Sequence, residues 1–115
     1  MTDKDRALLQ PALDYTGTHD IASIERALAA GTMQIWRGEK TVLITEIVQC
    51  PLKKLCQVAF IGGELSEVMQ FDDRIARWAK ANGCDSVWAA GRNGWGPVMK
   101  KRGWRQVGVT LERRL

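Results

Sequence analysis

Two segments near the start of the chain have the spacing of helices. Residues 20–30 place apolar side chains three or four positions apart, at Ile21, Ile24, Leu28 and Ala29. Asp20 is a suitable N-cap and Gly31 a suitable stop, so this segment predicts a complete helix. Residues 4–14 predict an earlier helix that is interrupted or ends near Pro11, because proline removes a helical hydrogen bond.

The middle of the chain changes to the pattern of strands. Met33–Trp36 and Lys40–Gln49 flank a turn, and the second segment is rich in Thr, Val and Ile, which suit a pleated surface. Leu55–Ile61 is almost continuously apolar, as expected of a central strand covered on both faces. Together the three segments predict an antiparallel meander.

A second kind of connection follows the meander. Gly62-Gly63 ends the central strand, and Leu65–Ala81 has the spacing of one long helix that leads to a short strand, Ser86–Ala90. This strand–helix–strand order predicts a parallel pair with a right-handed crossover. A short helix at Pro97–Arg102 and a last strand at Trp104–Glu112 complete the predicted elements.

Length and composition indicate one globular domain, residues 1–115. Apolar residues make up 45% of the chain and charged residues 26%. We expect no membrane segment, because every apolar run is too short to span a bilayer. We also expect a cytoplasmic location, with reduced thiols at Cys50, Cys56 and Cys84. One histidine, with no CxxC or HExxH spacing, predicts no metal site.

Charge is concentrated at the C-terminal end. Residues 92–115 hold seven Lys and Arg against one Glu, a net charge of +6, whereas residues 1–91 have a net charge of −2. The basic segment is either a solvated tail or the site of an anionic partner. Such a partner would be the phosphates of a cofactor, a nucleic acid or an acidic protein surface.

The order of the predicted elements resembles the GNAT (GCN5-related N-acetyltransferase) fold across residues 20–115. Asn93 after the strand, the helix around Val98–Lys101 and the pair Gly103-Trp104 match the family pattern. The resemblance implies an α/β (α+β) mixed sheet with helices on both faces, and acetyl-CoA as a possible ligand. The segment Gly91–Trp95 is also similar to small GNAT-like proteins of tailed bacteriophages, which implies a phage or host protein as a partner.

The loop that holds the CoA pyrophosphate in GNAT enzymes departs from the family pattern here. The resemblance assigns Gly62 and Gly63 to this loop, where backbone amides at a helix start would meet phosphate. No Arg or Gln precedes the glycines at the family spacing. Glu64 and Glu67 follow them, and their charges oppose phosphate unless they serve only as capping residues of the helix.

Acid–base candidates are few. The resemblance places the family's proton-donating tyrosine at Met99, whose thioether has no proton to donate. Glu46, on a predicted strand, is the candidate catalytic carboxylate and His19 the sole imidazole. If Glu46 has no catalytic role, we expect it to face solvent. If His19 has none, we expect it to cap a helix.

A glycine-rich turn at residues 91–96 offers a second anion site. Arg92, Asn93 and Gly94 stand between a strand and a helix start, where free backbone amides can bind phosphate, although such turns commonly only change chain direction. Trp95 beside Arg92 either stacks on a base, anchors a protein interface or folds over its own helix. Trp95 with Lys100, Lys101 and Arg105 forms the candidate partner-binding set.

Trp88 and Trp104 lie in predicted strands and are expected in the core.

Three functions remain open from the sequence. The first function is a binding or assembly module, an accessory or virion component that has lost the chemistry of the fold. The second is a CoA-dependent N-acyltransferase. The third is a nucleic-acid-associated or base-modifying protein, suggested by the basic segment and Trp95.

Overall fold

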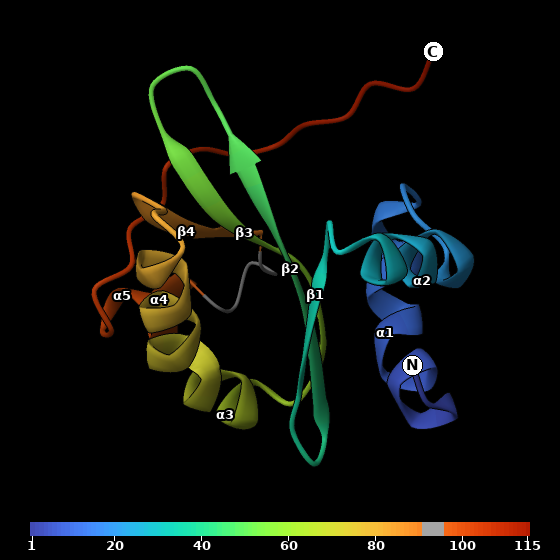
Figure 1. Ribbon diagram of the computed structural model, residues 1–115. Coiled ribbons are helices and arrows are strands. Elements are labelled where there is room, and N and C mark those ends of the chain that lie inside the picture. Colours follow the sequence, from blue (N-terminus) through green and yellow to red (C-terminus); the bar gives the residue numbers. More distant parts are fainter. Residues whose placement is uncertain (91–95) are drawn as a thin grey trace.

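The computed structural model describes residues 1–90 and 96–115, in which one four-stranded sheet separates two groups of helices (Figure 1). The strands pair in chain order and are β1 Gln34–Arg37, β2 Thr41–Gln49, β3 Lys54–Gly63 and β4 Ser86–Ala89. The helices are α1 Asp3–Thr16, α2 Ile21–Ala30, α3 Leu65–Val68, the 3-10 turn η1 Met69–Phe71, α4 Asp72–Ala81 and α5 Gly96–Lys100. The predicted mixed sheet with helices on both faces is confirmed.

Both kinds of strand pairing occur as predicted. β1, β2 and β3 are antiparallel, whereas β3 and β4 are parallel over Leu55–Val58 and Ser86–Ala89. The helical connection between β3 and β4 is divided, however, into α3, η1 and α4. Three residues per turn in η1 keep Val68 and Phe71 on one line, and both side chains are buried against the sheet.

Alternation along the strands sends side chains into two separate cores. Val42 and Ile44 of β2 pack with Leu9, Leu13 and other side chains from α1 and α2. The intervening Leu43 packs on the opposite face with buried side chains of β3, α3, η1 and α4, which are Cys56, Val58, Val68, Phe71, Ile75 and Ala79. The sheet is therefore covered by α1 and α2 on one face and by α4 on the other (Figure 1).

The first helix is longer than predicted, and the interruption at Pro11 is wrong. α1 runs through Pro11 to Thr16 and ends at Gly17, whose φ of 66° is left-handed. Leu9 and Leu13 on either side of the proline are fully buried, so packing compensates for the hydrogen bond that proline removes. α2 agrees with its prediction, with Asp20 as N-cap and Gly31 as C-cap.

The predicted last strand, Trp104–Glu112, is wrong. Its alternating apolar residues Val107, Val109 and Leu111 are 55%, 73% and 88% exposed. Within the described residues, the backbone from Arg105 onward makes no hydrogen bond to other backbone. Alternation gives a segment the propensity for a strand, but a strand also needs a neighbouring ladder to satisfy its backbone groups.

The expectation for Trp88 is also wrong, because this side chain is 40% exposed. It lies on β4, the last strand of the sheet within the described residues, where only β3 flanks it. Trp104 is half-buried, and its surroundings are described with the pocket below.

A buried acid joins the N-terminal helix to the sheet. Asp5 is 4% exposed, and its Oδ2 accepts hydrogen bonds from Arg37 Nε of β1 at 2.8 Å and from the backbone N–H of Thr2 at 2.9 Å. Burial by itself would raise the pKa of Asp5, but the hydrogen bonds from Thr2 and Arg37 and the Arg37 charge together lower it below the ordinary value of 3.8.

The lowered pKa predicts an acid-sensitive contribution to stability. A folded-state pKa below the unfolded value stabilises the protein above the unfolded pKa, and this contribution is lost as pH falls through the folded pKa. We expect Asp5→Asn to lower the free energy of unfolding by about 1–2 kcal/mol at pH 7, since Arg37 is half exposed and partly screened. Urea unfolding at pH 7 and below pH 4 tests this. A wild-type-to-variant difference that does not shrink in acid would contradict it.

Candidate functional site

A bulge in β3 interrupts its pairing with β2. Thr45 of β2 pairs with Val58 of β3, but the preceding Ile44 pairs with Phe60, so Ala59 is an extra residue in β3. Val58 is also the last β3 residue that pairs with β4, which ends at Ala89. Bulges bend a strand and increase its twist. The bulge at Ala59 therefore lies next to the end of the parallel pairing.

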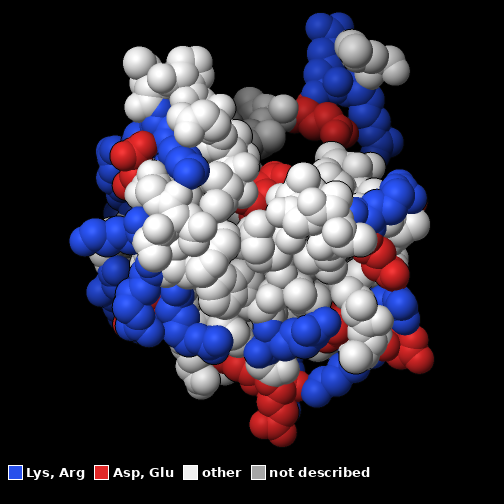
Figure 2. Space-filling model, viewed as in Figure 1, with Lys and Arg blue, Asp and Glu red and all other residues white. Residues whose placement is uncertain are grey.

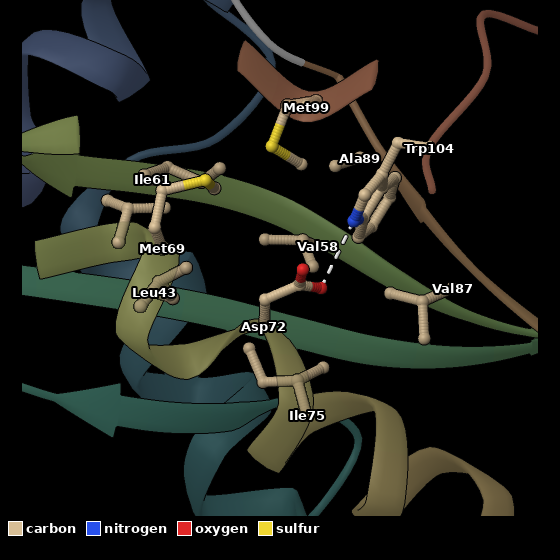
Figure 3. Close-up of a pocket in the computed structure, with 11 residues that line it drawn as sticks. Leu43, Val58, Ile61, Met69, Asp72, Ile75, Val87, Ala89, Met99 and Trp104 are labelled. Atoms are coloured by element: carbon tan, nitrogen blue, oxygen red, sulfur yellow. Dashed lines mark hydrogen bonds between the residues drawn. The ribbon is translucent and has the colours of Figure 1, made fainter. Parts of the chain in front are cut away.

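An apolar pocket lies next to the end of this pairing, on the face of the sheet that α4 covers. Its walls include Val58 and Ile61 of β3, Val87 and Ala89 of β4, and Ile75 of α4 (Figure 3). Met99 of α5 and Trp104 reach the same pocket from the C-terminal segment. The cavity volume is about 30 Å³, which holds roughly two water molecules. We refer to this cavity as the β3–β4 pocket.

One carboxylate borders the β3–β4 pocket and holds the C-terminal segment in place. Asp72 begins α4, and its Oδ1 accepts a hydrogen bond from Trp104 Nε1 at 3.1 Å (Figure 3). Arg102 Nε donates to the Oδ2 of the same carboxylate at 3.0 Å. The Asp72 side chain is 12% exposed. Two donors on one half-enclosed carboxylate fix Trp104 across the pocket.

The structure assigns the two predicted cofactor glycines to close backbone packing. A Cβ built on Gly62 would lie 2.0 Å from the Leu8 carbonyl oxygen of α1. One built on Gly63 would lie 2.1 Å from the Lys40 carbonyl oxygen, and Gly63 also has a φ of 122°. Glycine is required at both positions by neighbouring backbone, whether or not a ligand binds there.

The two acidic residues after the glycines differ in role. Both carboxylate oxygens of Glu67 accept the backbone N–H of Lys40, at 2.9 and 3.1 Å, so Glu67 caps the β1–β2 turn. Glu64 remains exposed, 4.0 Å from Lys40 Nζ. Glu67 thus has a structural role at the turn, and it keeps the negative charge that opposes phosphate.

The remaining sequence candidates do not meet at the pocket. Glu46 is half-buried on β2 opposite Gln57, and the alternation that puts Ile44 toward α1 and α2 puts Glu46 on that same face, away from the pocket. His19 is exposed and packs edge-on against Phe60, with ring centroids 5.0 Å apart. Met99 does lie in the pocket, at the place that the resemblance implied for a tyrosine.

The glycine-rich turn lies outside the described residues, except for Gly96. Arg92, Asn93, Gly94 and Trp95 lie outside the described residues. Lys100, Lys101 and Arg105 are exposed, and no salt bridge joins them to an acid within the described residues. Their assignment as partner-binding residues stays a prediction.

Three further findings concern the described residues. Across residues 1–90 and 96–115, His, Cys, Asp and Glu side chains never gather in a group of three that could bind a metal ion. The three cysteines are free thiols, and burial together with nearby Cys84 raises the pKa of Cys56 to about 11. No helix in the same residues combines the length and apolar character needed to cross a membrane.

The sequence matches no protein-family model and no curated protein, but solved structures share its architecture. A predicted acetyltransferase from Clostridium acetobutylicum, solved with acetyl-CoA, is 15% identical, with a TM-score of 0.69 over 99% of this chain and 92% of that one. A Trypanosoma brucei acetyltransferase is 11% identical, with a TM-score of 0.67 over 100% and 96% of the two chains. A tetramutant Bacillus halodurans protein is 13% identical, with a TM-score of 0.72 over 97% and 92%.

The chain has the GNAT fold. The match covers almost all of both chains, so the fold is present from α1 onward and is not a local similarity of the β3–α4–β4 unit. In this fold, the β3–β4 pocket lies beside the parallel strand pair, and Trp104 and Met99 line it from the C-terminal segment.

Sequence reasoning missed the most informative residue of the pocket. Asp72 was predicted only as part of the single long helix Leu65–Ala81, yet it borders the pocket and binds both Arg102 and Trp104. The separation of these residues along the chain leaves no local signal. The sequence shows an acid at the start of α4 and a base after α5, but nothing in it indicates that the two form an ion pair.

Proposed function

We propose that this chain is a CoA-dependent N-acyltransferase whose acyl-CoA cleft is the β3–β4 pocket. The observation that carries the proposal is the apolar pocket beside the parallel strand pair, next to the bulge at Ala59 and the end of the pairing between β3 and β4. Support comes from the GNAT fold and from a neighbour of that fold that was solved with acetyl-CoA.

The apolar lining of the pocket suits part of an acyl-CoA, but the cavity is too small to hold it in this conformation. Val58, Ile61, Val87 and Ala89 form walls suited to the pantetheine chain and a small acyl group. The cavity of about 30 Å³ admits neither while Trp104 lies across it. A bound acyl-CoA would supply the activated acyl group, and this chain's part is to bind it after Trp104 and Met99 have moved.

Binding of acetyl-CoA to the full chain tests the proposal. We expect acetyl-CoA at a hundredfold excess over its Kd to stabilise the fold by about 2.7 kcal/mol, which raises the Tm by roughly 10 °C for a domain of this size. Differential scanning calorimetry measures the shift, and transfer of a labelled acetyl group to a panel of amines measures the activity. No shift at millimolar acetyl-CoA would end the acyltransferase proposal.

Two adjacent alanines provide a matched control. Ala89 lines the pocket, whereas Ala90 is exposed and is not part of the lining. Ala89→Leu should fill the pocket and remove most of the shift, and Ala90→Leu should retain it. Circular dichroism of both variants separates a filled pocket from a failure to fold.

A binding or assembly module is the second candidate function. It is favoured by the small cavity and by Met99, which cannot act as a general acid in the pocket. A phage origin and a virion role stay predictions. Under this candidate the protein binds no acetyl-CoA and co-sediments with a larger particle.

The nucleic-acid alternative stays a prediction as well, and loss of DNA or RNA retention in Lys100→Ala would favour it.

A further inference from the structure

One arginine of α4 lies over two aromatic rings. The guanidinium carbon of Arg74 is 5.1 Å from the centre of the Phe71 ring and 5.9 Å from that of the Trp36 ring. Phe71 belongs to η1, directly before α4, and Trp36 belongs to β1, so the three side chains meet where η1 and α4 pack against the first strand. A guanidinium is planar and weakly hydrated, and it therefore stacks on aromatic rings. Arg74 is exposed, so its N–H groups remain accessible from outside.

The Trp36 ring beneath Arg74 is held by contacts inside the protein. Trp36 Nε1 donates to Thr45 Oγ1 at 3.0 Å, and the Thr45 hydroxyl donates to Gln34 Oε1 at 3.0 Å. Thr45 is fully buried. Trp78 of α4 packs at 80° to the Trp36 ring, with ring centroids 5.6 Å apart. Because its support is fixed, Arg74 loses less conformational freedom on binding a ligand than an unsupported surface arginine does.

Arg74 has no acidic partner of its own. The residues three and four positions away along the helix are Gln70, Phe71, Arg77 and Trp78. None of them can form the usual ion pair along a helix face. Within residues 1–90 and 96–115, no salt bridge includes Arg74, Arg77 or Lys80, the three cations of α4. An oriented guanidinium with unused donors is suited to a bidentate contact with a carboxylate.

The two acids of α4 lie toward the C-terminal segment. Oxygens of Asp72 and Asp73 are 3.0 and 4.0 Å from guanidinium nitrogens of Arg102. Counted with that partner, the helix carries Arg74, Arg77, Lys80 and Arg102 against Asp72 and Asp73, a net charge of +2. In Figure 2, Lys and Arg atoms predominate along the left side of the molecule, where Figure 1 places α4 and α5. The charge of this surface is complementary to an acidic partner.

The arrangement of the rings favours a carboxylate over a nucleic-acid base. A single strand binds through open aromatic faces on which its bases stack. Here Arg74 lies over the Trp36 ring, Trp78 packs against it, and Phe71 is only 4% exposed. The rings therefore position the cation and offer little flat surface to a base. Arg77 is exposed three residues further along α4, within reach of a second acid on the same ligand.

We propose that Arg74 binds a carboxylate in an acidic peptide segment of a protein partner, and that Arg77 contacts a neighbouring acid of the same segment. The site is separate from the β3–β4 pocket, whose lining includes neither Arg74 nor the two tryptophans beside it. This inference concerns a partner and does not depend on acyl-CoA binding.

Fluorescence anisotropy of a labelled octaglutamate peptide, mixed with the full chain at low ionic strength, tests the proposal. We expect saturable binding that Arg74→Gln weakens about 10-fold. Arg74→Lys keeps the charge but lacks the planar fork, and it should weaken binding about fivefold. Arg26→Gln is the matched control, because it removes the same charge from an exposed arginine of α2, on the opposite face of the sheet. It should leave the dissociation constant within about twofold of the wild-type value.

NMR of the ¹⁵N-labelled chain locates the contact, and shifts of the Arg74 Nε–H and Trp36 Nε1–H signals on addition of octaglutamate would support the proposal. Absence of binding would overturn it. An equal loss in Arg74→Gln and Arg26→Gln would also overturn it, because the attraction would then be general. Wild-type affinity in Arg74→Lys would exclude recognition by the planar fork. An octathymidylate strand that binds through Arg74 more tightly than octaglutamate would replace the acidic segment with a nucleic acid.

Discussion

Gly62→Ala is expected to destabilise the fold by about 3 kcal/mol or more, and it is the largest single effect that we predict. The added Cβ would lie 2.0 Å from the Leu8 carbonyl oxygen and 2.6 Å from its carbon, where α1 crosses the end of β3. Both atoms belong to the backbone, so no side-chain rotation can relieve the overlap. Relief requires α1 to move from the sheet, and α1 contributes Leu9 and Leu13 to the core.

Urea unfolding of Gly62→Ala beside Gly108→Ala measures this effect. A Cβ on Gly108 has no atom within 4 Å, so that variant should stay within about 0.5 kcal/mol of the wild-type protein. The comparison also separates two roles of Gly62. A glycine kept only for a phosphate would lose acetyl-CoA affinity on substitution and keep its stability. Gly62→Ala with wild-type stability would therefore refute the packing role.

Trp104→Ala is expected to tighten acetyl-CoA binding by about 10- to 100-fold, a result opposite to that of a typical pocket mutation. Trp104 lies across the β3–β4 pocket and donates a hydrogen bond to the Asp72 carboxylate. A hydrogen bond to a charged group contributes about 1.5–3 kcal/mol. A ligand that must first displace Trp104 binds more weakly by that amount, because only the open fraction of the protein is competent.

Isothermal titration of acetyl-CoA into Trp104→Ala and Trp88→Ala provides the measurement. Trp88 is the matched tryptophan because it is 40% exposed and does not line the pocket, so its removal should leave the affinity almost unchanged. Asp72→Asn keeps the ring in place but weakens its hydrogen bond, and it should give an intermediate affinity. Weaker binding to Trp104→Ala would show that the ring is part of the ligand's wall and does not obstruct it.

Local patterns predicted most of the fold. Asp20 and Gly31 bound α2 because capping depends on residues within one turn, and Leu55–Ile61 identified the central strand because burial on both faces leaves a continuous apolar run. The last strand, Trp104–Glu112, was mispredicted for the converse reason. Its alternation is strand-like, but whether a ladder forms depends on a partner that no local pattern specifies. The interruption predicted at Pro11 was wrong because the burial of neighbouring side chains outweighs the tendency of proline to end a helix.

The candidate site was less accessible from the sequence than the fold. Gly62 was predicted as part of a phosphate-binding loop, which stays a prediction, whereas the neighbour that requires a glycine there is Leu8, which is distant in the chain. Asp72 and Trp104 meet only because α4 and the segment after α5 flank the same pocket. The bulge beside the pocket depends on one extra residue in β3, which a continuous apolar run conceals.

That extra residue changes the course of β3 without changing which side chains enter which core. If Ala59 were deleted, Val58 would still face α4 and Phe60 would still face α1 and α2, because the bulge adds one position without changing the side on which its neighbours lie. The shortened β3 would pair evenly with β2. Loss of a single in-frame codon would thus remove the bend from the strand and keep both cores in register.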